Sequence, residues 1–309
     1  MEFGYTYTII IPHKNIQPLL RRCLNSIPRR KDIQVIVVDD GSDNYTETEA
    51  VVRNAGNAEI VYISGSGGAG RARNIGLRHA RGRWIVFADA DDFFTDELLP
   101  ALEGYSDSEF DIVFFDSCSA SSETLQPMPK RETSADRFRK SGDYGILRYT
   151  SHVVWGKMYS SRFVTENSIV FEEIAACNDY MFSGKAGILA HQIAFDDRVI
   201  YCYTVRSNSI STTISLNNCV VGLLARLRLN EMLRTARVPQ RYWDNALSPF
   251  GDMRKVSASA TLRYFGTYLR RTPPRRIGID AAQALCRIVL RLAGVDKSRS
   301  CRKMRKMEH

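Results

Sequence analysis

Short apolar segments alternate with helix-like segments along the first 115 residues of the chain. The apolar segments are rich in Val, Ile and aromatic residues and predict buried strands at Tyr7–Ile11, Ile33–Val38, Glu59–Ile63, Trp84–Ala88 and Asp111–Phe115. Helical spacing between them predicts helices near Pro18–Ile27, Tyr45–Asn54, Ala69–Ala80 and Thr95–Gly104. Strands that alternate with helices of this length predict an α/β fold with a doubly wound, mostly parallel sheet.

The rest of the chain changes character twice. Residues 117–142 are polar and rich in Ser, Thr and charge, which predicts an irregular loop to which we assign no chemistry. A helix is expected at Asp179–Leu189 and a strand at Val199–Val205. From about Cys219 the pattern predicts helices that carry arginines, among them an amphipathic helix at Ile277–Val295. We therefore predict a catalytic domain at residues 1–215 and a basic helical C-terminal region at residues 216–309.

Charge is divided unevenly between these regions. The net charge of the whole chain is +9, but residues 211–309 alone carry 20 Lys and Arg against 6 Asp and Glu. Such a segment favours an anionic partner, either membrane phospholipid or nucleic acid. We expect no nucleic acid, because no recognition module stands out. An anionic membrane surface and an ordinary solvated helix surface both stay open.

Other bulk features restrict the compartment. The seven cysteines are an odd number without metal-ligand spacing, which favours a reducing compartment. We see no secretory signal at the N-terminus, and no apolar run reaches the roughly 18 to 20 residues that span a bilayer. We expect a cytoplasmic protein, peripheral at most on the inner face of the cytoplasmic membrane.

Polar residues gather directly after three of the predicted strands, at Pro12–Asn15, Asp39–Ser42 and Asp89–Asp92. In open α/β sheets, ligands bind beyond the carboxyl ends of the strands. The three carboxylates within Asp89–Asp92 repel one another, so we expect a compensating cation, and oxygen ligands suit Mg²⁺ or Mn²⁺. The alternative is a solvated helix N-terminus, where acids offset the helix dipole.

The segment Asp39-Asp40-Gly41-Ser42 brings two further carboxylates into a tight turn. Gly41 permits the turn, and Ser42 or Asp43 is expected to cap the next helix. For Asp40 we favour contact with the base or ribose of a ligand.

The glycines at 65, 67 and 70 match the G-x-G-x-x-G dinucleotide fingerprint. They follow the third strand instead of the first, and a nicotinamide site would leave the acidic clusters without a role. We therefore interpret them as a flexible loop that leads Arg71 and Arg73 toward a ligand. A nicotinamide dehydrogenase stays as an alternative.

Four motifs now carry a resemblance to a known family. They are Ile9-Ile-Ile-Pro12-His-Lys-Asn15, Val-Val-Asp39-Asp40-Gly-Ser42, Gly70-Arg-Ala-Arg73-Asn74-Ile-Gly76 and Phe87-Ala-Asp89-Ala-Asp91-Asp92. In this order they resemble the signature of the family 2 glycosyltransferases with the GT-A fold. A looser likeness, similar to bacterial capsule and lipopolysaccharide transferases, continues through Trp155-Gly-Lys, Phe171-Glu172, Asn178-Asp179 and Tyr203-Thr-Val-Arg206-Ser-Asn-Ser209.

The resemblance implies a UDP-sugar donor. Pro12 and His13 would line the nucleotide pocket, Asp40 would hold the uracil, and Arg73 would approach the base or the diphosphate. The acceptor would be a saccharide or a lipid-linked glycan in the synthesis of a bacterial surface polysaccharide.

The resemblance also implies roles for the acidic cluster at Asp89–Asp92 and for Asp179. The resemblance implies that Asp89 contacts the ribose, with Ala90 also among the donor-binding residues, and that Asp91 ligates the metal ion that bridges the diphosphate. Asp179 would be the catalytic base, and one base opposite the leaving group implies inversion. The family usually shows Glu-Asp here, whereas this chain has Asn178-Asp179.

Two alternatives stay open at this stage. Asp179 also suits a helix-capping acid, since a helical pattern begins there. A non-catalytic relative that binds nucleotide-sugar or membrane without turnover would carry the same pocket residues.

Overall fold

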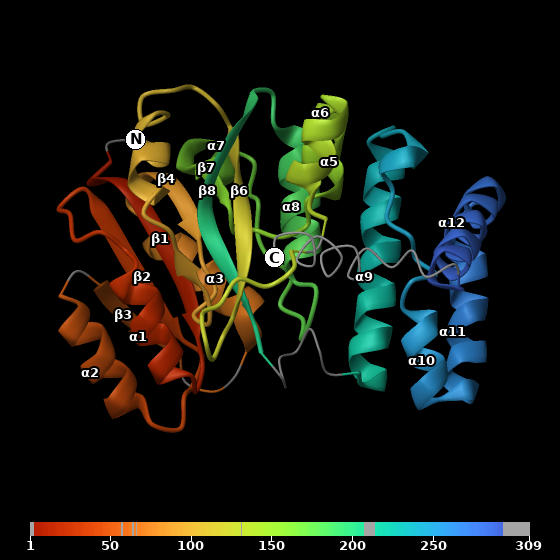
Figure 1. Ribbon diagram of the computed structural model, residues 1–309, viewed down its shortest axis with the longest axis horizontal. Coiled ribbons are helices and arrows are strands. Elements are labelled where there is room, and N and C mark those ends of the chain that lie inside the picture. The colour runs from red at the N-terminus through yellow and green to blue at the C-terminus, as the bar shows by residue number, and fades with distance from the viewer. Residues whose placement is uncertain are drawn as a thin grey trace, which may run out of the picture. The chain divides into compact units, whose positions relative to one another are not determined.

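The apolar segments of the sequence pair into one sheet in the computed structural model (Figure 1). The structure describes residues 3–56, 58–63, 65, 67–130, 132–206 and 214–292. The chain divides into two compact units, residues 1–207 and residues 208–309. Each unit has its own apolar core.

Eight strands make up the sheet within the described residues of the first unit. They are β1 (Tyr5–His13), β2 (Ile33–Asp39), β3 (Ala58–Tyr62), β4 (Gly82–Phe87), β5 (Phe93–Phe94), β6 (Ile112–Ser121), β7 (Lys157–Ser160) and β8 (Ile193–Val205). Their order is β3-β2-β1-β4-β7-β6-β8-β5. Strands β1 to β4 pair in parallel, as do β6 and β8, while β7 runs antiparallel to both β4 and β6. The predicted α/β fold is confirmed, and the short strands β5 and β7 were not predicted.

Helices cover both faces of this sheet. Those of the first unit are α1 (Gln17–Asn25), α2 (Tyr45–Ala55), α3 (Gly68–His79), α4 (Leu98–Glu103), α5 (Ser134–Ser141), α6 (Tyr144–Thr150), α7 (Ser161–Glu166) and α8 (Asp179–Leu189). On β1, Ile9 and Ile11 pack in the core that includes α1 and α2, and Ile10 packs in the core that includes α7 and α8. Since successive side chains of a strand point to opposite faces, a run of apolar residues is buried on both sides.

Two local predictions are wrong. Residues 117–142 are not one irregular loop, because β6 continues to Ser121 and α5 begins at Ser134. A capping box between Thr133 and Asp136 starts this helix despite its polar composition. Helix α2 is capped by Asn44, whose side chain accepts from the amide of Glu47, and not by Ser42 or Asp43.

The second unit is helical, as the sequence pattern predicts. It contains α9 (Leu216–Thr235), a short 3₁₀ turn at Gln240–Tyr242, α10 (Phe250–Val256), α11 (Ala258–Arg271) and α12 (Pro274–Leu292). A fully buried ion pair joins Arg276 to Asp280 at 2.7 Å, and the hydroxyl of Tyr268 donates to the same carboxylate at 3.1 Å. None of the described helices is both long and apolar enough to cross a bilayer. The end of the helix expected at Ile277–Val295 and the basic cluster at residues 299–306 lie outside the described residues.

Candidate active site

The carboxyl ends of the central strands bring the first predicted residues together. Pro12 and His13 close β1, and Asp39 closes β2 beside them, in register with His13. The His13 Nε2 atom lies 3.4 Å from the hydroxyl of Thr48 and 3.9 Å from the Asp39 carboxylate. Burial lowers the pKa of His13 to about 4, so the imidazole is neutral at physiological pH. It can therefore line a nucleotide pocket without adding charge.

Asp40 connects this edge to the glycine-rich segment. Its two carboxylate oxygens accept hydrogen bonds from the amides of Gly67 and Gly68, both at 2.8 Å. Gly41 has a φ of +72°, and a Cβ atom there would lie 2.9 Å from the carbonyl oxygen of Gly65. The glycines thus dock the start of α3 on the tip of β2, and Asp40 holds the two together.

The three carboxylates after β4 have three different protein partners. Asp89 pairs with Arg73 at 2.5 Å, and Asp91 pairs with Arg206 at 3.2 Å. Asp92 accepts from the hydroxyl of Tyr201 at 2.8 Å and from the amide of Thr204 at 2.7 Å. Protein groups therefore offset much of the repulsion among these carboxylates, for which the sequence alone predicted a compensating cation. Ala90 is buried in the core between them, so that only its backbone could face a ligand.

Asp91 is the residue of this cluster that the family resemblance assigns to a metal ion. Burial and the charge of Asp89 raise its pKa, and Arg206 opposes them. No three His, Cys, Asp or Glu side chains converge as a metal site anywhere in the described residues. Mg²⁺ usually binds one or two carboxylates together with substrate phosphates. The single carboxylate of Asp91 fits such an ion when diphosphate oxygens complete its coordination.

Arg73 joins the acidic cluster to a segment about a hundred residues away. Its Nη1 atom donates to the Asn178 side chain at 2.7 Å, its Nη2 atom contacts Asp89, and its guanidinium lies 5.4 Å from the ring centre of Phe171. Gly70, one turn earlier on α3, allows this approach, because a Cβ there would lie 2.1 Å from the carbonyl oxygen of Glu172. Arg73 therefore bridges the predicted donor side and the start of α8.

Asp179 is the first residue of α8, directly beyond this bridge. Burial raises the pKa of its carboxyl, and the positive charge of Arg73 opposes that shift. A carboxylate with a raised pKa is a better proton acceptor than one in water. The position also lies in the first turn of a helix, as the capping alternative requires, so the structure is compatible with both interpretations.

Sequence reasoning missed two residues of this site. Arg206 had only its place in the loose Tyr203–Ser209 likeness as a signal, and Lys157 had only the Trp155-Gly-Lys pattern. Lys157 is buried, donates to the carbonyl oxygen of Ser151 at 2.7 Å, and interacts with Asp179 through charge. Burial lowers the pKa of Lys157 to about 7.

Comparison with known proteins supports the resemblance. The family model for glycosyl transferase family 2 matches residues 8–167, just over half of the chain. The Staphylococcus aureus poly(ribitol-phosphate) beta-N-acetylglucosaminyltransferase TarS is 25% identical over 213 residues, which cover 65% of this chain and 36% of TarS. The uncharacterized glycosyltransferase EpsJ of Bacillus subtilis is 26% identical over 221 residues, covering 66% of this chain and 62% of EpsJ. The chain thus spans about a third of the first relative and less than two thirds of the second.

Solved structures show the same fold. A structure of S. aureus TarS residues 1–349 in complex with UDP-GlcNAc is 20% identical, covers 88% of this chain and 82% of that chain, and has a TM-score of 0.67. A mannosyltransferase from Pyrobaculum calidifontis in complex with GDP-Man and Mn²⁺ is 17% identical, covers 96% and 83%, and has a TM-score of 0.55. The GT-A fold expected from the motifs is therefore confirmed.

Proposed function

The chain belongs to glycosyl transferase family 2, and from this premise we propose that it transfers a sugar from a UDP-sugar to an acceptor hydroxyl with inversion. The observation that carries the proposal is the bridge made by Arg73. It connects Asp89, on the side where the donor would lie, with the helix that begins at the partly buried Asp179. A transferase needs a donor site and a base held at a fixed separation.

The donor site is assigned to the carboxyl edge of β1, β2 and β4. Pro12 and the neutral His13 line the nucleotide pocket, and Asp40, which the amides of Gly67 and Gly68 hold in place, contacts the uracil. Asp89 accepts hydrogen bonds from the ribose, with the backbone of Ala90 next to it. In this assignment Arg73 orients Asp89 and α8 and does not itself bind the nucleotide.

The diphosphate lies between Asp91 and Arg206 in this proposal. A bound Mn²⁺ or Mg²⁺, held by Asp91, would neutralise negative charge on the departing UDP. Arg206 supplies a second positive charge to the same phosphates and in their absence pairs with Asp91. The complex of the Pyrobaculum neighbour with Mn²⁺ supports the choice of metal.

Asp179 acts as the base. Its raised pKa suits the removal of a proton from the acceptor hydroxyl as that oxygen attacks the anomeric carbon. The bond from the anomeric carbon to the UDP oxygen breaks on the opposite face, so one displacement inverts the configuration.

The acceptor class follows from the relatives. TarS is named for transfer of N-acetylglucosamine to poly(ribitol phosphate), and a structural neighbour binds UDP-GlcNAc. We extend this to a saccharide or lipid-linked glycan that becomes part of a bacterial surface polysaccharide. The enzyme would work in the cytoplasm, on the inner face of the cytoplasmic membrane.

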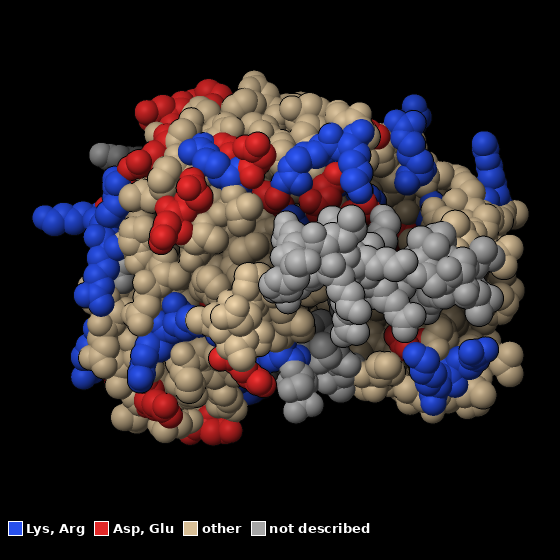
Figure 2. Space-filling model, viewed as in Figure 1, with Lys and Arg blue, Asp and Glu red and all other residues tan. Residues whose placement is uncertain are grey.

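Residues 216–309 would bring the enzyme to that membrane. Over α9–α12, the charged side chains visible in Figure 2 are mainly Lys and Arg. On α11, Leu262, Phe265 and Leu269 are 76%, 41% and 43% exposed and lie along one side of the helix, with Arg263 and Arg270 next to them. Exposed apolar residues beside arginines suit a helix that lies in the surface of an anionic bilayer.

Vesicle sedimentation tests this surface separately from catalysis. The protein should bind vesicles of phosphatidylglycerol and phosphatidylcholine more strongly than vesicles of phosphatidylcholine alone, and Leu262→Asp should weaken the binding. Leu125→Asp, an exposed leucine of the first unit, is the matched control. Equal binding by both variants and the parent protein would exclude α11 as the contact.

Release of UDP tests the catalytic proposal. The protein is incubated with a panel of UDP-sugars and acceptor, with Mn²⁺, with Mg²⁺ and with a chelator. Release that depends on a divalent ion is expected with at least one sugar. A protein that binds UDP without turnover would be the non-catalytic relative, and protection by NAD in place of UDP would point to the dehydrogenase.

A further inference from the structure

Two cysteines face each other across adjacent strands of the first unit. Cys118 of β6 and Cys202 of β8 are register partners in a parallel pair, and both are free thiols. Directly facing residues of neighbouring strands lie about 4.8 Å apart and project to the same face of the sheet. A disulfide requires a Cα separation of about 4.4–6.8 Å. The backbone therefore already holds the two residues at a separation at which their sulfur atoms can be joined.

The two thiols differ in access and in acidity. Cys118 is partly exposed, whereas Cys202 is 2% exposed. A hydrogen bond from Cys202 lowers the pKa of Cys118 to about 7; Lys130 acts in the same direction, and burial and Asp116 oppose it. The same hydrogen bond and burial raise the pKa of Cys202. The thiolate is the nucleophile in disulfide exchange, so the reachable member of the pair is also the reactive one.

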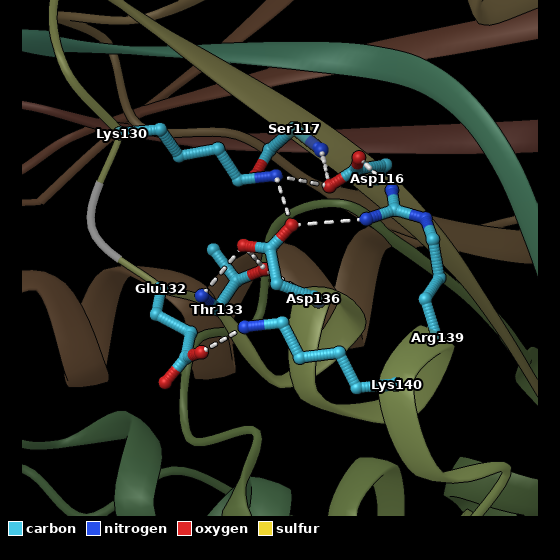
Figure 3. Close-up of polar contacts among 8 residues, drawn as sticks. All are labelled: Asp116, Ser117, Lys130, Glu132, Thr133, Asp136, Arg139 and Lys140. Atoms are coloured by element: carbon cyan, nitrogen blue, oxygen red, sulfur yellow. Dashed lines mark hydrogen bonds and ion pairs between the residues drawn. The ribbon is translucent and has the colours of Figure 1, made fainter. Parts of the chain in front are cut away.

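A cluster of charged residues holds the side chain of Lys130 in place. Lys130 contacts Asp116 at 2.5 Å and Asp136 at 3.4 Å, and Arg139 contacts both carboxylates (Figure 3). Asp116 lies two residues before Cys118, at an irregularity in the pairing of β6 with β8. The cluster thus fixes the ammonium group of Lys130 on Asp116 and Asp136, and its charge lowers the pKa of Cys118.

We propose that Cys118 and Cys202 form a site of reversible oxidation whose co-reactant is a low-molecular-weight disulfide such as glutathione disulfide. In the first step the Cys118 thiolate attacks one sulfur of glutathione disulfide, and one glutathione thiolate leaves. In the second step Cys202 gives up its proton to solvent and attacks the Cys118 sulfur, which releases the second glutathione. The protein dithiol is oxidised to a disulfide, and one glutathione disulfide is reduced to two glutathione molecules.

The remaining described cysteines do not share this arrangement. Cys23 and Cys219 are buried, and burial raises the pKa of each thiol. Cys177 and Cys286 are at least partly exposed, and neither lies in a strand of the sheet. Within the described residues, Cys118 and Cys202 are the only two cysteines that are partners in the register of the sheet.

The location gives the bond a structural consequence. Tyr201 and Thr204, on either side of Cys202 along β8, hold the Asp92 carboxylate. A disulfide would tie this part of β8 to β6 covalently. Oxidation would therefore act on the strand that supports the acidic cluster.

The test uses the full chain with Cys177, Cys286 and Cys301 replaced by Ser as the parent. After treatment with glutathione disulfide, peptide mapping without reductant should recover a peptide pair joined through Cys118 and Cys202. Cys202→Ser in the same parent should instead accumulate one glutathionyl group on Cys118, because the second step is lost. Cys118→Ser should give neither product.

Contrary results are equally clear. The proposal would be overturned if, after treatment with glutathione disulfide, Cys118 stays unmodified in the folded Cys202→Ser variant. It would also be overturned if the parent protein keeps both thiols after this treatment. If a variant does not fold, alkylation of the parent by iodoacetamide decides, since Cys118 must react faster than Cys202 near neutral pH. These readouts measure thiols and not sugar transfer, so they are independent of the proposed function.

Discussion

Asp136 and Asp179 both lie in the first turn of a helix, α5 and α8, and both are partly buried. Burial favours a raised pKa in each case. At Asp136, hydrogen bonds from Thr133 and the charge of Lys130 outweigh burial and lower the pKa (Figure 3). At Asp179, burial outweighs the positive charge of Arg73, and the pKa is raised.

The difference in pKa between these two carboxylates agrees with different roles, which are structural support for Asp136 and the proposed proton transfer for Asp179. The carboxylate of Asp136 accepts hydrogen bonds in a capping box and forms ion pairs with Lys130 and Arg139. It therefore stabilises its helix as a permanent anion. The raised pKa of Asp179 suits its proposed role as the base, and Arg73 holds the side chain of the preceding residue, Asn178. An acidic residue at a helix start therefore identifies neither role until its partners are known.

Removing each charge in turn tests whether Asp136 and Asp179 have different roles. Asp179→Asn should lower kcat by about 10²–10⁴-fold, the usual contribution of a general base, while binding of UDP is retained. Asp136→Asn is the matched control and should keep a near-normal kcat. Measurement of UDP release with acceptor decides, and similar rates for both variants would make Asp179 a capping acid.

The position of α8 can be disturbed without touching a charge. Gly70→Ala places a methyl group against the carbonyl oxygen of Glu172 and should push the segment that leads to Asp179 away from α3. A displacement of about 1 Å at a catalytic group costs on the order of 10²-fold in rate. Gly278→Ala has open space around it and serves as control. Equal kcat values would show that the contact is not needed for catalysis.

A third variant tests how Arg73 sets the pKa of Asp179. Arg73→Met removes a positive charge that lowers the pKa of Asp179, so that pKa should rise further. Because the base must be unprotonated, the rate should start to fall at a higher pH on acidification. Loss of the buried charge-assisted hydrogen bonds should also reduce kcat about tenfold or more. Arg139→Met, which removes a partner of Asp136, should leave the pH profile of kcat unchanged.

The smallest expected effect concerns stability. Asp136→Asn should lower the free energy of unfolding by about 1 kcal/mol at pH 7, as loss of a helix cap does. The folded pKa of Asp136 is lowered, so its contribution is complete above the ordinary pKa of about 4 and is lost as pH falls through the folded value. Urea unfolding at several pH values measures this. Asp107→Asn, whose side chain is 99% exposed, should show no such pH dependence.

Several features of the molecule could be predicted because their causes are local. The apolar segments of β1, β2 and β4 lie where their composition predicts, and α8 begins and ends at the expected residues. The glycines at 65, 67 and 70 do open a helix after the third strand. The short strand β7 was not predicted, because it begins with Lys157 and a lysine is not expected inside a sheet from sequence patterns.

The partners of the acidic residues could not be predicted, because they come from distant parts of the chain. Asp92 accepts hydrogen bonds from Tyr201 and Thr204, which lie more than a hundred positions later in the chain. Arg73 likewise donates to Asn178, more than a hundred positions away. The sequence argument placed a cation among three unpaired carboxylates, whereas the fold supplies a protein partner to each one. Repulsion between charges can be read from spacing, but the groups that relieve it cannot.

Periodicity and ordered motifs depend on neighbouring residues, so they identify the succession of strands and helices, the family and the edge of the sheet where chemistry is expected. The folded chain was needed to see that Asp40 secures the glycine segment, that Arg73 links Asp89 to α8, and that Cys118 faces Cys202. The physical reason is that hydrogen bonds, ion pairs and burial act over a few ångströms in space. Which side chains come within that range depends on how distant segments pack.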